Sequence, residues 1–176
     1  MSFVDSIDDP LHRQMYAYWQ EKRGARRLPS RADIDPTEIP RLLPNLLISE
    51  HVSEGAIERW RYRLAGTAVA AAFGRNPTGH YLDELTTGAY REFIERIHRV
   101  VREEQRALFC ASEYTGADDL RMSAKRLLLP VTTDGRLVDQ IITLLVFRLG
   151  AGSPAVIRLE QTEGTTTHAG PILAET

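Results

Sequence analysis

The order of strand-like and helical segments predicts an α+β fold built on an antiparallel sheet. Two strand-like runs, 46–52 and 57–64, precede a helical region, and three more follow it at 108–115, 120–132 and 136–149. Strands gathered in runs around a helical block form antiparallel sheets, whereas parallel sheets need strands and helices in alternation. We therefore expect a five-stranded antiparallel sheet with the middle helices over one face and an N-terminal helix on the other.

The composition favours a self-contained domain with no nucleic-acid or membrane partner. The 176 residues are enough to bury a core without a disulfide or a metal, and 22 basic against 24 acidic residues give a formal net charge of −2. Cys110 is the only cysteine, which excludes an internal disulfide and fits a reducing compartment. The first residues show no secretory pattern, and the longest apolar run, 141–147, is too short to span a bilayer. We expect a cytoplasmic protein.

The first expected element is a helix that starts after Asp9. Asp9 can cap this helix, Pro10 suits its first position, and Gly24 ends it. Apolar side chains recur at helical spacing on one face: Leu11, Met15, Tyr18 and Trp19. The basic residues that follow have no aromatic residues between them, so we interpret them as a solvated helix end and loop.

Acidic residues in the next, proline-containing segment are best explained as helix caps. Asp35 precedes Pro36, and Glu38 stands where it would complete a capping box for a short helix over 36–42. Asp33, Asp35 and Glu38 also fit a metal cluster, but capping accounts for two of them, so we expect no metal site.

The middle of the chain is expected to fold over one face of the sheet. Gly66 allows a sharp change of direction after the second strand, a helix of small residues fits 68–73, and Gly74 caps it. After a turn at 76–79, a long amphipathic helix over 90–105 presents an apolar stripe to the sheet.

The last part of the chain shows that both faces of the sheet must be covered. Asp134 and Gly135 give a hairpin signal between the last two long strands, and a further short strand fits 156–159. Within 141–147 apolar side chains stand in both alternating sets, which a strand with one wet face would not show; the sets are Ile141, Leu145 and Phe147, and Ile142, Leu144 and Val146. The N-terminal helix has the apolar face needed to cover the outer side.

The chain resembles a PAS domain, and more closely the family of short bacterial proteins with a single, stand-alone PAS-like domain. The resemblance rests on Trp19 and on the phrases at 29–36 (PSRADIDP), 62–67 (YRLAGT), 74–79 (GRNPTG) and 127–130 (LLLP). It spans about residues 11–149. It implies an antiparallel sheet whose helices enclose a small-molecule pocket, in a sensor or interaction module, and it implies no particular ligand. We expect a helix and connection over 1–35, a PAS-like domain over 36–150 and a C-terminal extension over 151–176.

Two residues bear on the cofactors that PAS domains use. Light-sensing flavin relatives have a reactive cysteine just after Gly-Arg-Asn, where this chain has Pro77, so a flavin adduct is not expected. Haem-binding relatives use a histidine near the long helix, and His98 is comparable. Because Arg96 and Arg99 flank it, we interpret His98 as a surface or boundary histidine rather than an iron ligand. The cofactor remains unassigned.

We expect a mostly apolar pocket between the long helix and the sheet, with a small apolar molecule as its ligand. The candidate lining residues are Tyr62, Phe73, Leu82, Phe93, Ile97, Leu108, Cys110, Ser112 and Met122. Tyr62 and Ser112 are the candidates for orienting polar groups. The alternative for most of these side chains, Cys110 above all, is to fill the core.

The sequence favours a sensing or interaction module over an enzyme. No P-loop, Gly-x-Ser-x-Gly elbow, His-Glu-x-x-His or paired-cysteine zinc pattern occurs. The alternative is a small cavity enzyme of isomerase or hydrolase type, with a buried acid or base from Glu113, Asp139 or His98. A stand-alone module signals through a partner or by self-association, so we expect a homodimer through the N-terminal helix.

Overall fold

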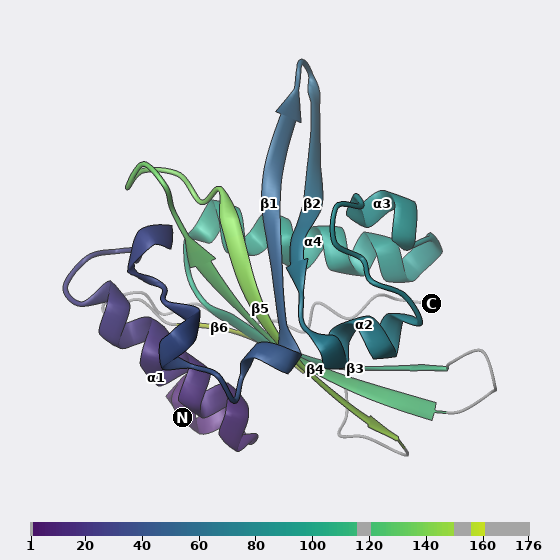
Figure 1. The fold of residues 1–176 in the computed structure, drawn as a ribbon, viewed down its shortest axis with the longest axis horizontal. Helices are drawn as coiled ribbons and strands as arrows, with labels where there is room; N and C mark the ends of the chain where they lie inside the picture. Colours follow the sequence, from purple (N-terminus) through teal and green to yellow (C-terminus); the bar gives the residue numbers. More distant parts are fainter. Residues whose placement is uncertain (1, 116–120, 150–155, 161–176) are drawn as a thin grey trace.

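The protein is built on one antiparallel sheet with the strand order β2-β1-β5-β4-β3-β6 (Figure 1). The computed structural model describes residues 2–115, 121–149 and 156–160. The strands are β1 (Leu46–Glu54), β2 (Ile57–Ala65), β3 (Leu108–Thr115), β4 (Arg121–Val131), β5 (Gln140–Leu149) and β6 (Val156–Leu159). Strands β1 to β5 confirm the predicted α+β fold and five-stranded antiparallel sheet, and β6 extends this sheet beyond β3.

Two runs of strands meet at the centre of the sheet, although the helical middle of the chain separates them. The β1–β2 hairpin comes first, and β5, the end of the later run, pairs with β1. Leu47 lies opposite Thr143 across this junction. The connection between β2 and β3 contains the helices α2 (Thr67–Phe73), α3 (Leu82–Leu85) and α4 (Gly88–Glu104). Because both strand runs belong to one sheet, the helices that connect them pack on that sheet.

Helix α1 (Pro10–Arg23) covers the outer face of the sheet. Asp9 caps it by accepting a hydrogen bond from the Leu11 N–H at 2.9 Å. The Trp19 indole is fully buried and donates from Nε1 to the Pro130 carbonyl oxygen at 2.9 Å. The predicted position of this helix is confirmed, and the helix supplies the cover that the two apolar faces of β5 require.

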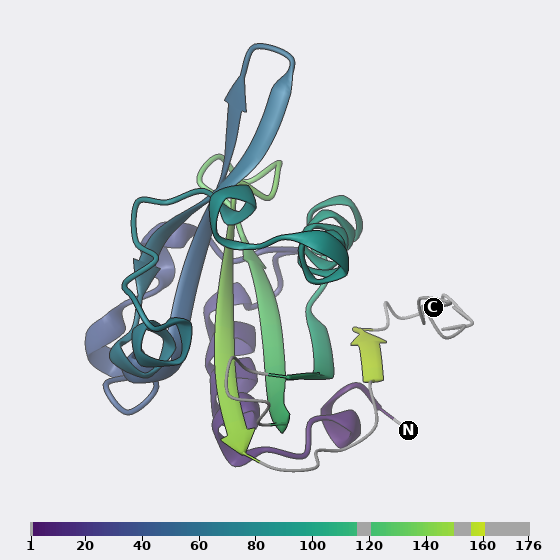
Figure 2. The same ribbon diagram turned by 90° about the vertical axis from the view of Figure 1, so that its right-hand side faces the viewer.

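Helix α4 crosses the opposite, inner face of the sheet (Figure 2). Its side chains Ile94, Ile97 and Val101 are buried, as are Leu108 of β3 and Leu128 of β4 on the sheet. The result is a layered molecule with α1 on one side, the sheet in the middle and α4 on the other. The space between α4 and the sheet is where the sequence places a ligand pocket.

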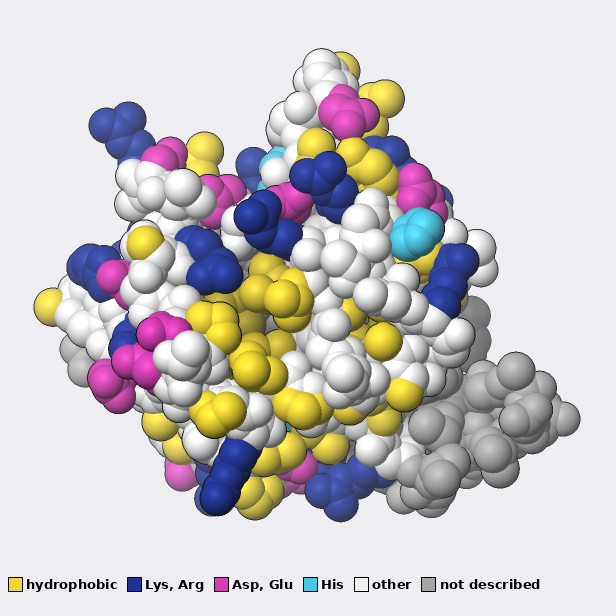
Figure 3. Space-filling model, in the orientation of Figure 1, with side chains coloured by type: hydrophobic (Ala, Val, Ile, Leu, Met, Phe, Trp, Pro, Cys, Tyr) yellow, Lys and Arg dark blue, Asp and Glu magenta, His cyan; other side chains and the backbone are white. Residues whose placement is uncertain are grey.

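The face seen in Figure 3 has hydrophobic side chains gathered in its middle, between α1 and β1. Charged side chains lie mostly toward the edges of this face. Within the part of the chain that the structure describes, no helix is both long and apolar enough to cross a membrane.

The expected helix over 36–42 is wrong, because the chain forms separate 3₁₀ turns in this region. They cover Pro36–Glu38 and Leu43–Asn45. Pro40 and Pro44 have no backbone N–H group and cannot donate the hydrogen bond that a residue inside an α-helix makes to the carbonyl four residues earlier. A continuous helix is therefore disfavoured in this segment.

The acidic residues of this segment act separately. Asp35 caps the first 3₁₀ turn, as predicted. Glu38 accepts a hydrogen bond from the Tyr18 hydroxyl at 2.8 Å instead of completing a capping box. A capping box does form one turn earlier, between Ser30 and Asp33. Among the described residues, no group of His, Cys, Asp or Glu side chains is arranged to hold a metal ion.

The connection between β4 and β5 is longer than the Asp134–Gly135 signal predicts. Strand β5 begins at Gln140 rather than at position 136. The Asp134 carboxylate accepts hydrogen bonds from the N–H groups of Arg136 and Leu137 at 2.8 and 3.2 Å, which organises the residues beyond the turn as a loop. The Asp-Gly pair therefore marks the turn but not its length.

Gly66 is required by a close approach of two backbone segments. A Cβ atom at this position would lie 2.1 Å from the Leu43 carbonyl oxygen and 2.4 Å from that of Pro44, so no other residue fits without a shift of the backbone. Helix α2 starts directly after it and ends at Gly74, whose φ of 70° lies in the left-handed region. The change of direction at Gly66 was predicted, and it places the start of α2 in contact with the 3₁₀ turn that precedes β1.

Candidate functional site

A small cavity, the inner chamber, lies between α4 and the inner face of the sheet and has a volume of about 20 Å³. Its apolar lining consists of Leu47, Phe73, Ile94, Ile97, Leu128 and Leu145. Its polar lining consists of Tyr62, Tyr90, His98, Arg126 and Thr143. A cavity of this size has room for about one water molecule. The inner chamber is therefore small, and its polar lining distinguishes it from the apolar core around it.

Arg126 is the central polar residue of the inner chamber. It lies on β4 and is only 3% exposed. Its Nη1 donates to the Ser112 hydroxyl of β3 at 2.7 Å, and its Nη2 donates to the Tyr90 hydroxyl of α4 at 3.0 Å. The guanidinium carbon also lies 5.8 and 5.9 Å from the ring centroids of Tyr90 and Phe93. One buried cation thus connects two strands of the sheet with the helix that covers them.

The charge of Arg126 acts on the titratable groups around it. Burial is the main reason why the pKa of His98 falls to about 4, and the positive charge of Arg126 lowers it further. Burial raises the pKa of Cys110 to about 11, while Arg126 acts in the opposite direction by favouring the thiolate. Both groups are neutral at neutral pH, and both are subject to a positive potential from Arg126.

His98 is buried, so its interpretation as a surface or boundary histidine is wrong. It is 4% exposed. Its Nδ1 lies 2.9 Å from the Ile94 carbonyl oxygen and must donate there, because a carbonyl only accepts. Its Nε2 lies 3.0 Å from the Ser49 hydroxyl and accepts from it. Both ring nitrogens are therefore occupied, which leaves none to bind an iron.

Thr143 supplies the second unusual feature of the inner chamber. It lies on β5, is 3% exposed, and lines the cavity. Its hydroxyl has no hydrogen-bond partner among the described residues. A buried hydroxyl without a partner is costly and is generally satisfied by water or a ligand in a folded protein. The hydroxyl of Thr143 thus marks a place for a further polar group.

The structure brings part of the predicted pocket together. Tyr62, Phe73 and Ile97 line the inner chamber. Phe93 and Ser112 contact the Arg126 side chain that lines it. The polar lining residues that the sequence did not identify are Tyr90, His98 and Arg126.

The remaining predicted residues lie elsewhere or beside the chamber. Leu108 and Cys110 are buried on β3, and Cys110 is the register partner of Arg126 on β4. Leu82 is buried but lines a separate depression on the surface. Met122 belongs to β4, and its side chain lies outside the described part of the structure.

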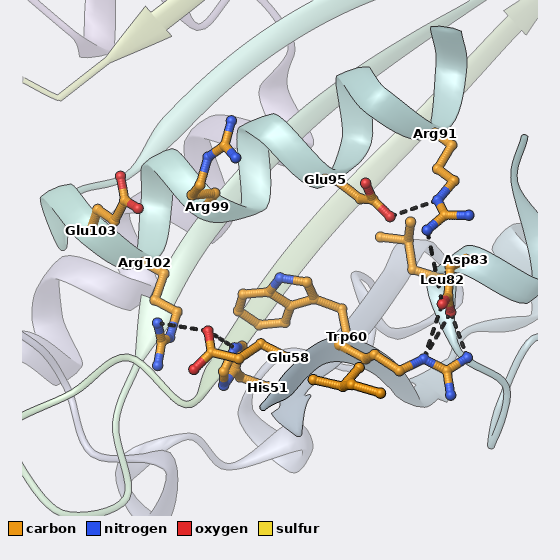
Figure 4. A pocket seen from close by; sticks show the side chains of 12 residues that line it. His51, Glu58, Trp60, Leu82, Asp83, Arg91, Glu95, Arg99, Arg102 and Glu103 are labelled. Carbon is orange, nitrogen blue, oxygen red and sulfur yellow. Dashed lines mark hydrogen bonds and ion pairs between the residues drawn. The ribbon is translucent and has the colours of Figure 1, made fainter. Parts of the chain in front are cut away.

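This surface depression, the outer groove, has a volume of about 420 Å³ and lies between the β1–β2 hairpin and α4 (Figure 4). Much of its charged lining is already paired. Arg59 Nη2 lies 2.7 Å from Asp83 Oδ1, and Arg91 Nε lies 2.7 Å from Glu95 Oε1. Such solvent-accessible pairs contribute little to stability and are screened by salt. The groove is therefore a solvated, mixed-charge surface.

Trp60 separates the outer groove from the inner chamber. Its ring lies 5.1 Å from the ring of His51 on the groove side and 5.0 Å from the ring of His98 on the chamber side. Trp60 is 9% exposed and lines the groove, while His98 lines the chamber. A row of three packed rings thus forms the wall between the two spaces.

The antiparallel sheet with helices on both faces defines an α+β fold rather than an alternating α/β fold. A family model described as PAS domain matches residues 7–146, which is more than half of the chain, so the chain belongs to the PAS domain family. Members of this family are in general sensory and interaction modules without catalytic activity. Neither the comparison with curated proteins nor that with solved structures gives a significant match.

Proposed function

We propose that this PAS domain is a small-molecule sensor and that the inner chamber is its ligand site. The observation that carries this proposal is the unpartnered hydroxyl of Thr143 in a cavity that also contains the buried charge of Arg126. Polar groups of this kind are expensive in an apolar core, and binding sites are where proteins keep them.

The small volume of the inner chamber gives a reason why binding would be sensed. At about 20 Å³ the chamber accepts nothing larger than a water molecule, so a ligand has to move its walls. Tyr90 on α4 is hydrogen-bonded to Arg126 on β4. A ligand that competes for Arg126 would therefore loosen or shift α4, and the difference between the two states is the signal.

The electrostatics support binding rather than catalysis. A general acid or base works best with a pKa near the working pH, whereas the pKa of His98 is about 4 and that of Cys110 about 11. Asp139 lies in the β4–β5 connection, where its carboxylate accepts a hydrogen bond from the Thr133 N–H at 3.0 Å. The side chain of Glu113 lies outside the described part of the structure.

Self-association through α1 is the second part of the proposal. The hydrophobic side chains in the middle of the face shown in Figure 3 lie beside α1 and support it. The large apolar residues of α1 itself, Met15, Tyr16 and Trp19, are already buried in its own protomer. A homodimer would therefore use the solvent-facing side of α1 together with the neighbouring apolar surface.

A thermal-shift screen of the full-length protein with neutral, anionic and cationic small molecules tests the ligand proposal. Leu128 and Leu127 are neighbours on β4 and are both fully buried, but only Leu128 lines the inner chamber. Leu128→Phe should fill the chamber and abolish the shift that a hit causes, whereas Leu127→Phe should lower the melting temperature similarly and keep the shift. Equal responses of the two variants, or the lack of any hit, would refute the proposal.

A further inference from the structure

Strand β6 lies at one end of the described sheet and covers the outer edge of β3. Its four residues pair in antiparallel register with 108–111 of β3. The strand lies outside residues 7–146, which the family model matches. The edge of a sheet presents unpaired N–H and C=O groups to any strand that can pair with it. Strand β6 therefore occupies an edge at which a strand of another molecule has the same backbone groups to bind.

Glu160, the residue after β6, fastens this strand to the body of the protein. Glu160 is 8% exposed, and its Oε1 accepts a hydrogen bond from the Tyr16 hydroxyl of α1 at 2.5 Å. Arg23 Nη1 of α1 lies 3.3 Å from the same oxygen, and the Ala107 N–H donates to Oε2 at 3.3 Å. The Glu160 backbone also donates to the Ala107 carbonyl oxygen at 2.8 Å. We call Tyr16, Arg23 and the Ala107 N–H the carboxylate clamp.

The carboxylate clamp consists of donors that suit a negative group. Burial raises the pKa of Tyr16, and its hydrogen bond to Glu160 raises it further, so the Tyr16 hydroxyl keeps its proton at physiological pH. The Arg23 guanidinium is always charged, and it lies 4.8 Å from the ring centroid of Trp19. Hydrogen bonds from such donors to a carboxylate are roughly twice as strong as those to a neutral acceptor. The clamp therefore selects a carboxylate over an amide.

Glu160 uses the carboxylate clamp incompletely. Its contacts with Arg23 Nη1 and the Ala107 N–H are both 3.3 Å, whereas strong hydrogen bonds between charged groups measure about 2.7–2.9 Å. Arg23 Nε is buried and has no partner among the described residues. The planar fork of arginine holds both oxygens of a carboxylate when the carboxylate reaches far enough. A segment with a better placed carboxylate would therefore displace Glu160.

We infer that the outer edge of β3 and the carboxylate clamp form a docking site for a partner protein, through an extended segment in which an acidic residue follows a strand. Residues 156–160 occupy this site in cis and so block it. The backbone of the added strand supplies affinity, and the clamp supplies specificity for the carboxylate. A second copy of this chain offers only the same segment, with no better fit than the one already in place. None of the clamp residues lines the inner chamber, so this inference does not depend on the proposed ligand.

The test uses the full-length protein and a fluorescent peptide with the sequence of residues 154–160, PAVIRLE, blocked at both ends. Glu160→Gln weakens the cis contact and should bind this peptide at least roughly tenfold more tightly than the wild type by fluorescence anisotropy. A peptide with Gln in place of its Glu should bind Glu160→Gln at least roughly tenfold more weakly, as expected for hydrogen bonds to a charged group. Glu38→Gln is the matched control, because the Glu38 carboxylate also contacts a tyrosine and a cation of α1 but lies away from β3.

Hydrogen exchange shows whether the strand edge takes part. Glu160→Gln should increase amide exchange within 108–111, and the peptide should restore the protection. If Glu160→Gln does not fold, Tyr16→Phe should also increase this exchange, whereas Tyr18→Phe should not. Equal binding of the two peptides, equal binding by wild type and Glu160→Gln, or unchanged exchange within 108–111 would overturn the docking site. If the peptide dissociates a wild-type dimer in light scattering, the occupant is a second copy and the partner protein is excluded.

Discussion

The Tyr90 hydroxyl on α4 and the Arg126 guanidinium on β4 are joined by a hydrogen bond of 3.0 Å across the inner chamber. This contact connects the helix that covers the sheet to the strand that carries the buried charge. Because Arg126 also donates to Ser112 on β3, a change at Arg126 alters hydrogen bonds to β3 and to α4.

Tyr90→Phe should destabilise the protein by about 1.5–3 kcal/mol, the range for a hydrogen bond to a charged group. It should also increase amide hydrogen exchange in α4, because the helix loses a polar attachment to the sheet. Tyr81→Phe is the matched control, since it removes a tyrosine hydroxyl that donates to Glu54 at an exposed site. Chemical denaturation and hydrogen-exchange mass spectrometry measure the two effects, and unchanged exchange in α4 would contradict the coupling.

Thr143→Val should leave the ligand-free protein as stable as before or stabilise it by about 1 kcal/mol, because the change removes a buried hydroxyl without a partner. Thr132→Val should destabilise by about 1 kcal/mol, since the Thr132 hydroxyl bonds to the Asp134 carboxylate and the Gly135 N–H. Urea denaturation of both variants measures the difference. Equal losses would mean that a bound water already satisfies Thr143.

The placement of helices on both faces of the sheet could be predicted from the spacing of apolar residues in the sequence. Apart from Thr143, both alternating sets within 141–147 of β5 are apolar, which requires a cover on each face, and α1 and α4 are the amphipathic segments able to provide it. The physical reason is that burial of apolar surface is non-directional, so a pattern of side chains suffices to predict it. The position of α1 on the outer face was predictable on this ground.

The polar centre of the site was not predictable in the same way. Lys125 and Arg126 are adjacent on β4, and each stands in an alternating set with leucines, so a shift of one residue exchanges their faces. Only the register, with Arg126 opposite Leu145 and Lys125 opposite Val146, places the arginine inside. Pairing between distant strands sets this register, and a local pattern does not contain it.

His98 was misjudged because its neighbours along the chain are charged. Adjacent positions on an α-helix point in different directions, so Arg99 says little about the surroundings of His98. The spacing from Ile94 and Val101, four residues before and three after, places His98 on the buried stripe of α4. Helical spacing was the signal that could have identified it.

The stability of the protein should fall between pH 6.5 and pH 4, in part because of His98. Its pKa is lowered from 6.5 to about 4 in the fold, mainly by burial, so the unfolded chain binds the proton first as the pH falls. The contribution of neutral His98 to the free energy of unfolding is complete above pH 6.5 and decreases as the pH falls from 6.5 to 4. At 1.36 kcal/mol for each pKa unit, the total decrease is about 3 kcal/mol.

Urea denaturation of His98→Gln at several pH values checks this contribution. The variant should lose less stability than the wild type between pH 6.5 and pH 4. An unchanged pH dependence in His98→Gln would show that other groups cause it.

The homodimer through α1 is best tested with a charge on the solvent-facing side of this helix. Deletion of the residues before Leu28 would also uncover the sheet beneath Trp19, so a substitution separates association from folding. Full-length protein at micromolar concentration should be dimeric by light scattering. Ala17→Arg should make it monomeric, because Ala17 is exposed on α1 and a buried unpaired charge opposes association. Ala56→Arg, at the exposed tip of the β1–β2 hairpin, should leave the dimer intact. A monomeric wild-type protein, or a dimer that survives Ala17→Arg, would show that α1 covers only its own sheet.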